Sequence, residues 1–242
     1  MSLLYDANGD ILTSGSVTPP TVGTATWWVK LSSASRQMVP WGTFAGASYL
    51  GTDFEFGSAG APIYCVRQRG TTDIEVRADS GNFAAFGTGK WIFVAFVWDS
   101  GGAASGQKLF VGDETTAPAQ PSAYTLQAVG SGASDTTAGT VYIGNASYDT
   151  TLWVDGRMGG FALYSRALSD ADIAAAWAAS SPTGANCQIY YRLGSNGTTN
   201  VPDESGNGNT GTITGLSSAD SLPVVLFGRS ARARNHYHRR RT

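Results

Sequence analysis

Hydrophobic and polar residues alternate with a period of two along several short stretches of the chain. Residues 24–31, 51–57 and 71–79 each place apolar side chains at every second position, with mainly polar ones between them. This period is typical of β-strands that bury one face and leave the other in water. Residues 91–98 are apolar at every position, which predicts a strand that is covered on both faces.

The period changes once, from the strand alternation of residues 158–164 to a helical spacing further along. Ser169 and Asp172 have the spacing of a capping box, in which a serine hydroxyl and an acidic side chain satisfy exposed N–H groups of the first helical turn. Alanine-rich sequence follows, and Pro182 stops the pattern. We therefore predict one short helix over residues 169–179.

Two apolar contacts are predicted to hold this helix in place. Leu168 and Ile173 have the spacing of a hydrophobic staple at the helix start. Trp177 shares one helical face with Ile173, because residues four apart lie one above the other. We therefore expect Trp177 to anchor the helix on the sheet as part of the core.

The composition agrees with an all-β chain. Its 242 residues include 31 glycines, with 14% charged and 11% aromatic residues, which suits many tight turns around one large core. We predict an all-β, antiparallel two-sheet jelly-roll sandwich with one short helix. Residues 1–20 are polar and end in two prolines, so we expect an N-terminal arm there. Residues 21–221 would form the sandwich and residues 222–242 a C-terminal arm.

Several other features narrow the class of protein. The longest apolar run, residues 91–98, is too short to span a bilayer, and we expect no membrane partner. No leader with basic, apolar and small residues opens the chain, so we expect no secretory signal. Cys65 and Cys187 are far apart in the sequence, which leaves open whether they are buried thiols or a disulfide.

Four motifs in the chain share one family pattern. Residues 24–30 read T-A-T-W-W-V-K, residues 89–99 read G-K-W-I-F-V-A-F-V-W-D, residues 157–173 read R-M-G-G-F-A-L-Y-S-R-A-L-S-D-A-D-I, and residues 203–211 read D-E-S-G-N-G-N-T-G. Together they resemble the laminin-G-like domains of the concanavalin A-like lectin/glucanase superfamily. The resemblance implies a concanavalin A-like sandwich. In the family the last run usually precedes the first, so we expect one sandwich with a permuted strand.

The resemblance also raises a calcium site, because family members often bind calcium near the sandwich rim. Oxygen-bearing side chains stand at alternate positions of one loop, as in calcium loops: Asp203, Ser205, Asn207 and Asn209. This loop lacks a distal bidentate glutamate, and residues 159–160 are glycines where the family usually has an acidic pair. Asx and Gly residues also form ordinary turns. We favour a structural turn and expect no cofactor and no tightly held ion.

Superfamily glucanases carry catalytic carboxylates on one strand face, and retaining glycosidases need two of them about 5–5.5 Å apart. Asp53 with Glu55, and Asp73 with Glu75, each share a strand face, but neither pair has the third carboxylate that the family pattern requires. We interpret these faces as solvated, with internal salt bridges. Both histidines lie near the C-terminus, so the rest of the chain has no Ser-His or Cys-His arrangement. We expect no enzyme activity.

Three aromatic residues are candidates for a sugar-stacking platform: Trp28, Trp41 and Tyr148. Trp28 interrupts the alternation of its strand on the polar side, where an aromatic ring could meet a glycan. The alternative is that such a residue packs under a loop, since an aromatic ring outside the regular alternation is more often covered than exposed.

The C-terminus combines a short apolar run with a strongly basic one. Six of the sixteen Lys and Arg residues lie within the last fourteen residues, which contain no acid, so the remaining ten face eighteen acids and the body carries about −8. The candidate partner-binding residues of this arm are Phe227, Arg229, Arg232, Arg234, His236, Tyr237, His238, Arg239, Arg240 and Arg241. The arm could bind nucleic acid, remain a solvated tail or dock on a protein. We favour docking, because arginine pairs bidentately with carboxylates.

Two classes of function follow from these features. The first is a non-enzymatic structural module of a large assembly, such as a capsid decoration or head/tail appendage on a bacteriophage virion. It would be made in the host cytoplasm, form homo-oligomers and bind a capsid or other virion protein through its termini. The second is a carbohydrate-binding lectin module for glycan or host-surface adhesion, as the resemblance suggests.

Overall fold

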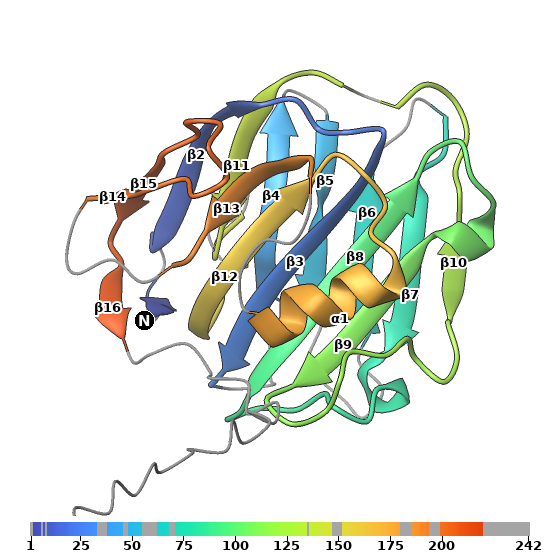
Figure 1. Cartoon of the computed structure of the whole chain (residues 1–242), viewed down its shortest axis with the longest axis horizontal. Coiled ribbons are helices and arrows are strands. Elements are labelled where there is room, and N and C mark those ends of the chain that lie inside the picture. The colour runs from blue at the N-terminus through green and yellow to red at the C-terminus, as the bar shows by residue number, and fades with distance from the viewer. Residues whose placement is uncertain are drawn as a thin grey trace, which may run out of the picture.

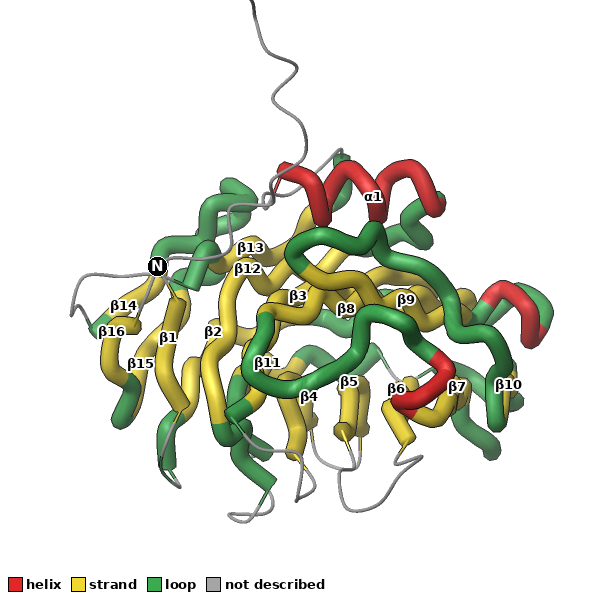
Figure 2. Tube along the Cα trace, turned by 90° about the horizontal axis from the view of Figure 1, so that it is seen from below, coloured by secondary structure: helices red, strands yellow, loops and turns green. Residues whose placement is uncertain are grey.

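The computed structural model describes residues 2–5, 7, 9–32, 38–45, 48–54, 62–67, 71–134, 136–146, 152–179, 185–193 and 199–219. These residues form two antiparallel sheets that face each other, with one α-helix, α1 (Asp170–Ala179), across the outer face of one sheet (Figures 1 and 2). The predicted two-sheet sandwich with one short helix is confirmed.

The strands of the two sheets come from all parts of the chain. The seven-stranded sheet runs β16 (Ser217–Ala219), β1 (Ser2–Tyr5), β12 (Gly156–Tyr164), β3 (Val22–Leu31), β8 (Trp91–Asp99) and β9 (Lys108–Asp113), with β13 (Cys187–Tyr191) also paired to β12. The nine-stranded sheet runs β10 (Leu126–Ala128), β7 (Ile74–Asp79), β6 (Pro62–Arg67), β5 (Ser48–Phe54), β4 (Met38–Ala45), β11 (Gly139–Ile143), β2 (Ile11–Val17), β15 (Gly211–Thr214) and β14 (Asn200–Val201). Two short 3-10 helices, η1 (Ser80–Asn82) and η2 (Ala104–Gly106), lie in the loops that follow β7 and β8.

The main core lies between the sheets and contains several aromatic rings. Trp27 of β3 and Trp41 of β4 are fully buried, with ring centroids 5.9 Å apart in an edge-on arrangement. Phe161 of β12 lies 5.4 Å from the Trp41 ring. Aromatic pairs of this kind contribute about 0.5–1.5 kcal/mol each beyond the area they bury. Because β4 belongs to one sheet and β3 and β12 to the other, these contacts join the two sheets.

A second apolar cluster lies between α1 and the seven-stranded sheet. On β8, Phe93, Ala95 and Val97 belong to this outer cluster, whereas the residues between them belong to the main core. All of residues 91–98 are buried, which confirms the predicted strand with both faces covered. Ile173, Ala176 and Trp177 are the α1 residues that pack on this face.

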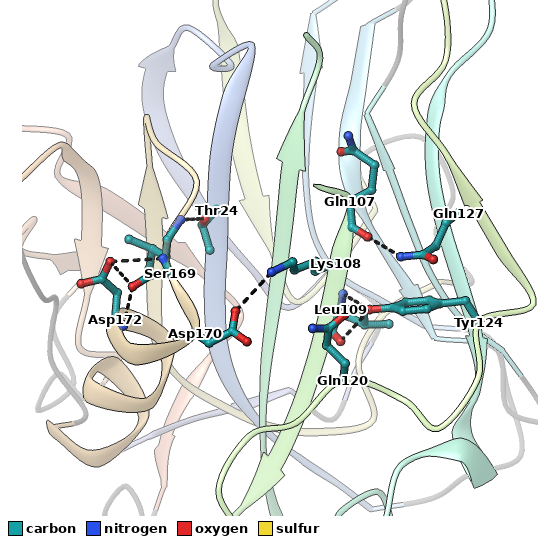
Figure 3. A network of polar contacts seen from close by, with 11 residues as sticks. Thr24, Gln107, Lys108, Leu109, Gln120, Tyr124, Gln127, Ser169, Asp170 and Asp172 are labelled. Carbon is teal, nitrogen blue, oxygen red and sulfur yellow. Dashed lines mark hydrogen bonds and ion pairs between the residues drawn. The ribbon is translucent and has the colours of Figure 1, made fainter. Parts of the chain in front are cut away.

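The start of α1 has the predicted capping box. The Asp172 N–H donates to Ser169 Oγ at 3.2 Å, and the Ser169 N–H donates to Asp172 Oδ2 at 3.2 Å (Figure 3). Leu168 and Ile173 are both buried in the cluster beneath the helix, as the hydrophobic staple predicts. Lys108 of β9 contacts Asp170 at 3.3 Å, which adds a polar contact between the helix start and the sheet. The prediction of a helix over residues 169–179 is therefore confirmed.

Stability should fall in acid partly because of Asp172. The Arg166 guanidinium, 2.9 Å away, and the hydrogen bonds from Ser169 lower the pKa of this carboxyl to about 2. A folded pKa below the unfolded value of about 3.9 stabilises the native state above pH 4, and this contribution is lost as the pH falls from about 4 to 2. Asp172→Asn should cost about 1 kcal/mol or less at pH 7, because the pair is partly exposed.

Urea unfolding of the wild type and Asp172→Asn at pH 7 and at pH 2.5 checks this expectation. The stability gap between the two proteins should narrow at the lower pH, where the wild-type carboxyl begins to protonate. A gap that stays constant between these pH values would show that the charge on Asp172 is not what stabilises the helix start.

The predicted N-terminal arm is wrong over the described residues of 1–20. Within this segment, β1 pairs with β12 and β16, and β2 lies between β11 and β15 inside the nine-stranded sheet. Leu3, Tyr5 and Leu12 are at most 1% exposed. The polar composition concealed β2 because a serine takes one of its inward positions. Ser14 Oγ accepts the Val141 N–H at 2.9 Å, which satisfies both groups in the core.

The run that follows α1 is also part of the sandwich. Residues 203–211 connect β14 to β15, and β15 pairs with β2 through Thr212 and Thr13. The family motif found at the end of this sequence therefore lies beside the first part of the chain. Within the described residues, no helix is both long and apolar enough to cross a membrane.

Candidate functional site

A polar groove of about 290 Å³ lies at the edge of the sandwich. Its lining residues are Ser16, Val17, Thr18, Gln188, Asn207 and Asn209. They come from the end of β2, from β13 and from the loop before β15, which lie on the same side of the molecule (Figure 1). Because β2 and β13 belong to different sheets, the groove exists only when the two sheets and this loop are assembled.

Asp203 organises the loop that forms one wall of the groove. Its Oδ1 accepts the N–H groups of Tyr190 and Ser205 at 3.0 Å each, and its Oδ2 accepts the Asn209 N–H at 2.9 Å. Burial opposes ionisation of this carboxyl, but hydrogen bonds from the three backbone N–H groups and from the Ser205 side chain outweigh it and lower the pKa of Asp203. The carboxylate therefore joins the loop to β13 as an anion.

Two amides bind the same loop to the β13 backbone. Asn207 Nδ2 donates to the carbonyl oxygens of Cys187, at 2.7 Å, and Gln188, at 3.1 Å. Asn209 Nδ2 donates to the Gln188 carbonyl at 2.9 Å. Ser205 Oγ donates to the same carbonyl at 3.2 Å, and the Tyr191 hydroxyl donates to the Asn209 carbonyl. Side chains of the loop therefore make most of its hydrogen bonds to β13, together with one backbone hydrogen bond from the Glu204 N–H to the Tyr190 carbonyl at 2.9 Å.

Two hydroxyl groups at the groove remain available to a ligand, and one buried amide oxygen beside them has no partner. Ser16 and Thr18 are exposed, and neither hydroxyl makes a hydrogen bond to another described residue. Gln188 Oε1 is buried and has no hydrogen-bond partner. A buried acceptor without a donor is costly, since it loses water without replacing it.

The four candidate calcium ligands lie close together, in a turn that is held by hydrogen bonds. Both oxygen atoms of Asp203 are aimed at N–H donors, and the amides of Asn207 and Asn209 turn their nitrogens toward backbone carbonyls. No group of three or more His, Cys, Asp or Glu residues that could hold a metal ion occurs in the described part of the chain. The arrangement is the structural turn that the Asx and Gly residues predict, and it does not fit a calcium cage.

The second of the two glycines at 159–160 has a structural reason. Gly160 has a φ of +59°, and a Cβ there would lie 3.3 Å from Cδ1 of Trp28 beneath α1. This left-handed conformation is unfavourable for residues with a side chain. An acidic residue at this position would carry its charge into the apolar cluster under the helix, where it would have to be desolvated.

Replacing Asp203 should destabilise the protein whether or not calcium is present. Asp203→Asn puts an NH₂ group where at least one backbone N–H now donates, so one buried donor loses its acceptor. We expect a loss of about 1–3 kcal/mol in the free energy of unfolding. Thermal unfolding with EDTA or with added calcium should give the same midpoint for the wild type. A calcium-dependent rise that disappears in Asp203→Asn would contradict the structural role.

Trp28 and Trp41 do not form the predicted sugar-stacking platform. Their side chains are 1% and 0% exposed. Trp28 lies in the cluster on the outer side of the seven-stranded sheet, and Trp41 lies in the core on its inner side. Trp28 packs against Phe93 with ring centroids 5.3 Å apart, beneath α1. Trp41 lies in the main core between the sheets. The stacking hypothesis is therefore wrong for both rings, and the alternative of packed rings holds. Tyr148 lies outside the described residues.

Of the four candidate catalytic carboxylates, Asp73 and Glu75 lie in the described part of the chain. Glu75 Oε1 lies 3.2 Å from an Arg77 guanidinium nitrogen on the same strand face, which confirms the predicted internal salt bridge. Asp73 precedes β7 on the same alternation. Glu55 and the side chain of Asp53 lie outside the described part of the chain.

The remaining site predictions concern the cysteines and the C-terminal arm. No disulfide joins Cys65 and Cys187; Cys65 is buried and Cys187 is half-buried. Burial raises the pKa of the Cys187 thiol to about 12, so it stays protonated at neutral pH. The proposed partner-binding residues between Phe227 and Arg241 all lie outside the described residues.

Sequence reasoning identified one wall of the groove and missed the other. The loop residues Asn207 and Asn209 stood out because they belong to a motif. Ser16, Thr18 and Gln188 carried no comparable signal, since isolated Ser, Thr and Gln residues are common on any surface. The only pointer was the polar run at residues 13–18, which ends at two prolines.

A sequence comparison with known families assigns the chain. The model described as concanavalin A-like lectin/glucanases superfamily, of the laminin G type, matches residues 6–174. The chain belongs to this superfamily. The match includes the capping box and the strand before it, and it ends before the Asp203–Asn209 loop. A search of curated proteins finds no match.

Solved structures with the same fold have sequences that differ widely from that of this chain. A heptameric SAP-like pentraxin from Limulus polyphemus aligns with a TM-score of 0.59 and 10% identity, over 93% of this chain and 97% of the pentraxin. A candidate carbohydrate binding protein from Bacteroides ovatus gives 0.56 and 13%, over 89% of this chain and 60% of that protein. The enzymatically active domain of tailspike protein 2 from bacteriophage CBA120 gives 0.58 and 12%, over 76% of this chain and 28% of the tailspike. The TM-scores show that these proteins share the fold of this chain, and identities of 10–13% show no more than that.

Proposed function

We propose that this chain is a non-enzymatic saccharide-binding module. The observation that carries the proposal is the polar groove between β2, β13 and the Asp203–Asn209 loop. Its lining offers hydroxyl and amide groups on a wall that is held rigid by hydrogen bonds to backbone atoms. Pre-organised polar groups of this kind suit a ligand with many hydroxyls, because little side-chain freedom is lost on binding. The name of the superfamily and the carbohydrate binding protein from Bacteroides ovatus support the same class of ligand.

The groove has no group that could carry out acid–base catalysis. None of its six lining residues titrates near neutral pH, whereas hydrolysis of a glycosidic bond needs a positioned proton donor and a base or nucleophile. The tailspike neighbour is an enzyme, so fold similarity does not decide between binding and catalysis. The chemistry of the groove favours binding.

Isothermal titration against a panel of oligosaccharides tests the proposal. At least one saccharide should bind, and the double variant Ser16→Ala/Thr18→Val should weaken this binding about tenfold or more, because both exposed hydroxyls are removed. Thr88→Val is the matched control. Thr88 is an exposed threonine beside the C-terminal end of β3, where Gly89 contacts Leu31, about 30 Å from Thr18 along the strand. Saccharide binding unchanged by the double variant would show that the groove is not the site.

A second proposal concerns where the module works. We propose that it is carried on the surface of a bacteriophage virion, as a capsid decoration or a head/tail appendage, after synthesis in the host cytoplasm. Two features support this. The body carries an excess of acids while the last fourteen residues carry six arginines, a distribution suited to docking on a protein partner. A phage tailspike domain also has this fold. The partner would be a capsid or other virion protein, and the module would assemble as a homo-oligomer.

Deletion of residues 228–242 tests this second proposal. The truncated protein should keep its thermal midpoint and its saccharide binding but lose incorporation into particles, measured by quantitative gel analysis of purified virions. Incorporation of the full chain in vitro should weaken with salt, because ion pairs at the rim of an interface are screened. Full occupancy of the truncated protein would contradict the anchor role. Tight, salt-sensitive binding of the C-terminal arm to DNA would favour the nucleic-acid alternative.

A further inference from the structure

One residue of the groove, Gln188, interrupts the alternation of its strand. In β13, Ile189 and Tyr191 face the main core, and Tyr190 faces the cluster beneath α1. Continued alternation would place the Gln188 side chain in that cluster as well. Instead Cys187 packs against the cluster, and Gln188 lines the groove. The alternation of the strand therefore shifts by one position at Gln188.

The pairing of β13 with β12 explains this shift. Leu163 pairs with Ile189 and Tyr164 pairs with Cys187, so Gln188 is an extra residue between them, with no partner on β12. Such a β-bulge bends its strand and redirects a side chain, and bulges are over-represented next to functional sites. Here the bulge directs Gln188 away from the face under α1 and toward the groove.

We propose that the Gln188 amide nitrogen is a hydrogen-bond donor to the bound saccharide, and that the protein keeps this residue at the expense of stability. The proposal rests on the proposed saccharide-binding function and names a specificity-determining residue of the same site. The saccharide group that it recognises is an oxygen with a free lone pair, such as a hydroxyl or ring oxygen.

The two ends of the Gln188 amide have different surroundings. Its Oε1 is buried and has no hydrogen-bond partner among the described residues. Because this residue lines the groove, the end of the amide at the groove is Nε2, which makes no hydrogen bond to another described residue. The opposite orientation would bury two N–H donors in place of one acceptor, and buried donors without acceptors are the rarer case. The amide therefore offers two N–H groups to a ligand.

The backbone of Gln188 fixes where this nitrogen lies. Its carbonyl oxygen accepts hydrogen bonds from Asn209 Nδ2 at 2.9 Å, Asn207 Nδ2 at 3.1 Å and Ser205 Oγ at 3.2 Å. These contacts involve only the main chain of Gln188, so a change of its side chain leaves them in place. A donor on a backbone that is held in this way loses little freedom when it binds a saccharide.

The buried oxygen makes Gln188 unfavourable for folding. A buried acceptor without a donor loses its hydrogen bonds to water and gains none in return. An apolar side chain of the same length would avoid this loss, but it could not donate to a saccharide. Residues that serve binding at the expense of stability are typical of functional sites. Gln188→Met should therefore have opposite effects on stability and on binding.

Thermal unfolding and isothermal titration of Gln188→Met test the proposal, with oligosaccharides of the gluco, galacto and manno series as probes. Without saccharide, the thermal midpoint of the variant should be higher than that of the wild type by about 2–4 °C. Its affinity for the oligosaccharide that the wild type binds best should be lower by about tenfold or more. A saturating amount of this oligosaccharide should raise the midpoint of the wild type more than that of the variant.

Gln127→Met is the matched control. Gln127 is a half-buried glutamine on β10, at the edge of the nine-stranded sheet that is far from β2. Its Nε2 donates to the Gln107 carbonyl at 2.8 Å (Figure 3). Because this amide has a partner within the protein, methionine should lower the thermal midpoint by about 2–4 °C and leave saccharide binding unchanged.

The possible outcomes separate this proposal from the proposed function. If Ser16→Ala/Thr18→Val weakens binding and Gln188→Met does not, the groove binds saccharides but Gln188 is not a donor to them. If Gln188→Met fails to raise the midpoint in the absence of saccharide, the residue is not kept at the expense of stability, and the proposal is overturned even where binding is lost. If no oligosaccharide binds, or if binding ignores all three positions, the proposed function itself fails and the proposal fails with it.

Discussion

Replacing Trp177 with alanine should lower the free energy of unfolding by about 3–5 kcal/mol. The side chain is 3% exposed and lies in the cluster between α1 and the seven-stranded sheet. Its Nε1–H donates to the Asp113 carbonyl at the end of β9, at 2.8 Å. Truncation therefore leaves a cavity beneath the helix and removes the donor of a buried carbonyl. Urea unfolding followed by circular dichroism measures the loss.

Trp177→Phe separates the two contributions of this residue. Phenylalanine keeps most of the apolar contact but cannot donate to Asp113, so it should cost about 1–3 kcal/mol, less than alanine. An unchanged unfolding midpoint in Trp177→Ala would show that the helix is not anchored through this ring. Equal losses in both variants would assign the anchor to the hydrogen bond rather than to packing.

Gly144→Ala should have a still larger effect and should prevent normal assembly of the sandwich. Gly144 follows β11 with a φ of +85°, and a Cβ there would overlap the Tyr5 ring. Its N–H donates to the Pro40 carbonyl at 2.7 Å, and its carbonyl accepts the Val154 N–H at 2.8 Å, so the backbone is held on both sides. Tyr5 is fully buried. We expect a loss of about 4 kcal/mol or more, or insoluble protein.

Gly89→Ala is the matched control for the backbone conformation. Gly89 has a φ of +73°, and nothing lies within 4 Å of a Cβ placed there. This variant should cost only the strain of a left-handed alanine, about 1–2 kcal/mol. The difference between the two glycine variants measures the clash with Tyr5. Similar losses at both positions would mean that Tyr5 moves aside easily and that its packing is loose.

Local signals predicted the helix and most of the strands, because they depend on residues close in sequence. Ser169 and Asp172 satisfy each other within one turn, so the capping box could be read directly. The alternation of residues 71–79 likewise predicted β7 and its outward salt bridge between Glu75 and Arg77. In these segments the local pattern and the tertiary structure agree.

The errors arise where the structure depends on distant partners. β2 appeared polar because Ser14 takes an inward position, and only Val141, 127 residues further along, shows why that position is tolerated. Trp28 appeared to face solvent because the alternation cannot reveal that α1 covers that side of the sheet. The groove brings residues 16–18 next to Gln188, Asn207 and Asn209. These two parts of the chain are far apart in sequence, so no local pattern could predict that they form one site.

The pairing of β2 with β15 has a consequence for how the protein is made. Thr13 pairs with Thr212, and Leu3 of β1 pairs with Ser218, so the first strands complete their sheets only with strands near the other end of the chain. At ribosomal speeds of about 5–20 residues per second, β2 leaves the ribosome roughly 10–40 s before β15 is available. During this interval one edge of β2 has no partner and can pair with another nascent chain. Folding of this sandwich should therefore finish only after β15 has emerged from the ribosome, and its yield in the cell should depend on chaperones that shield β2.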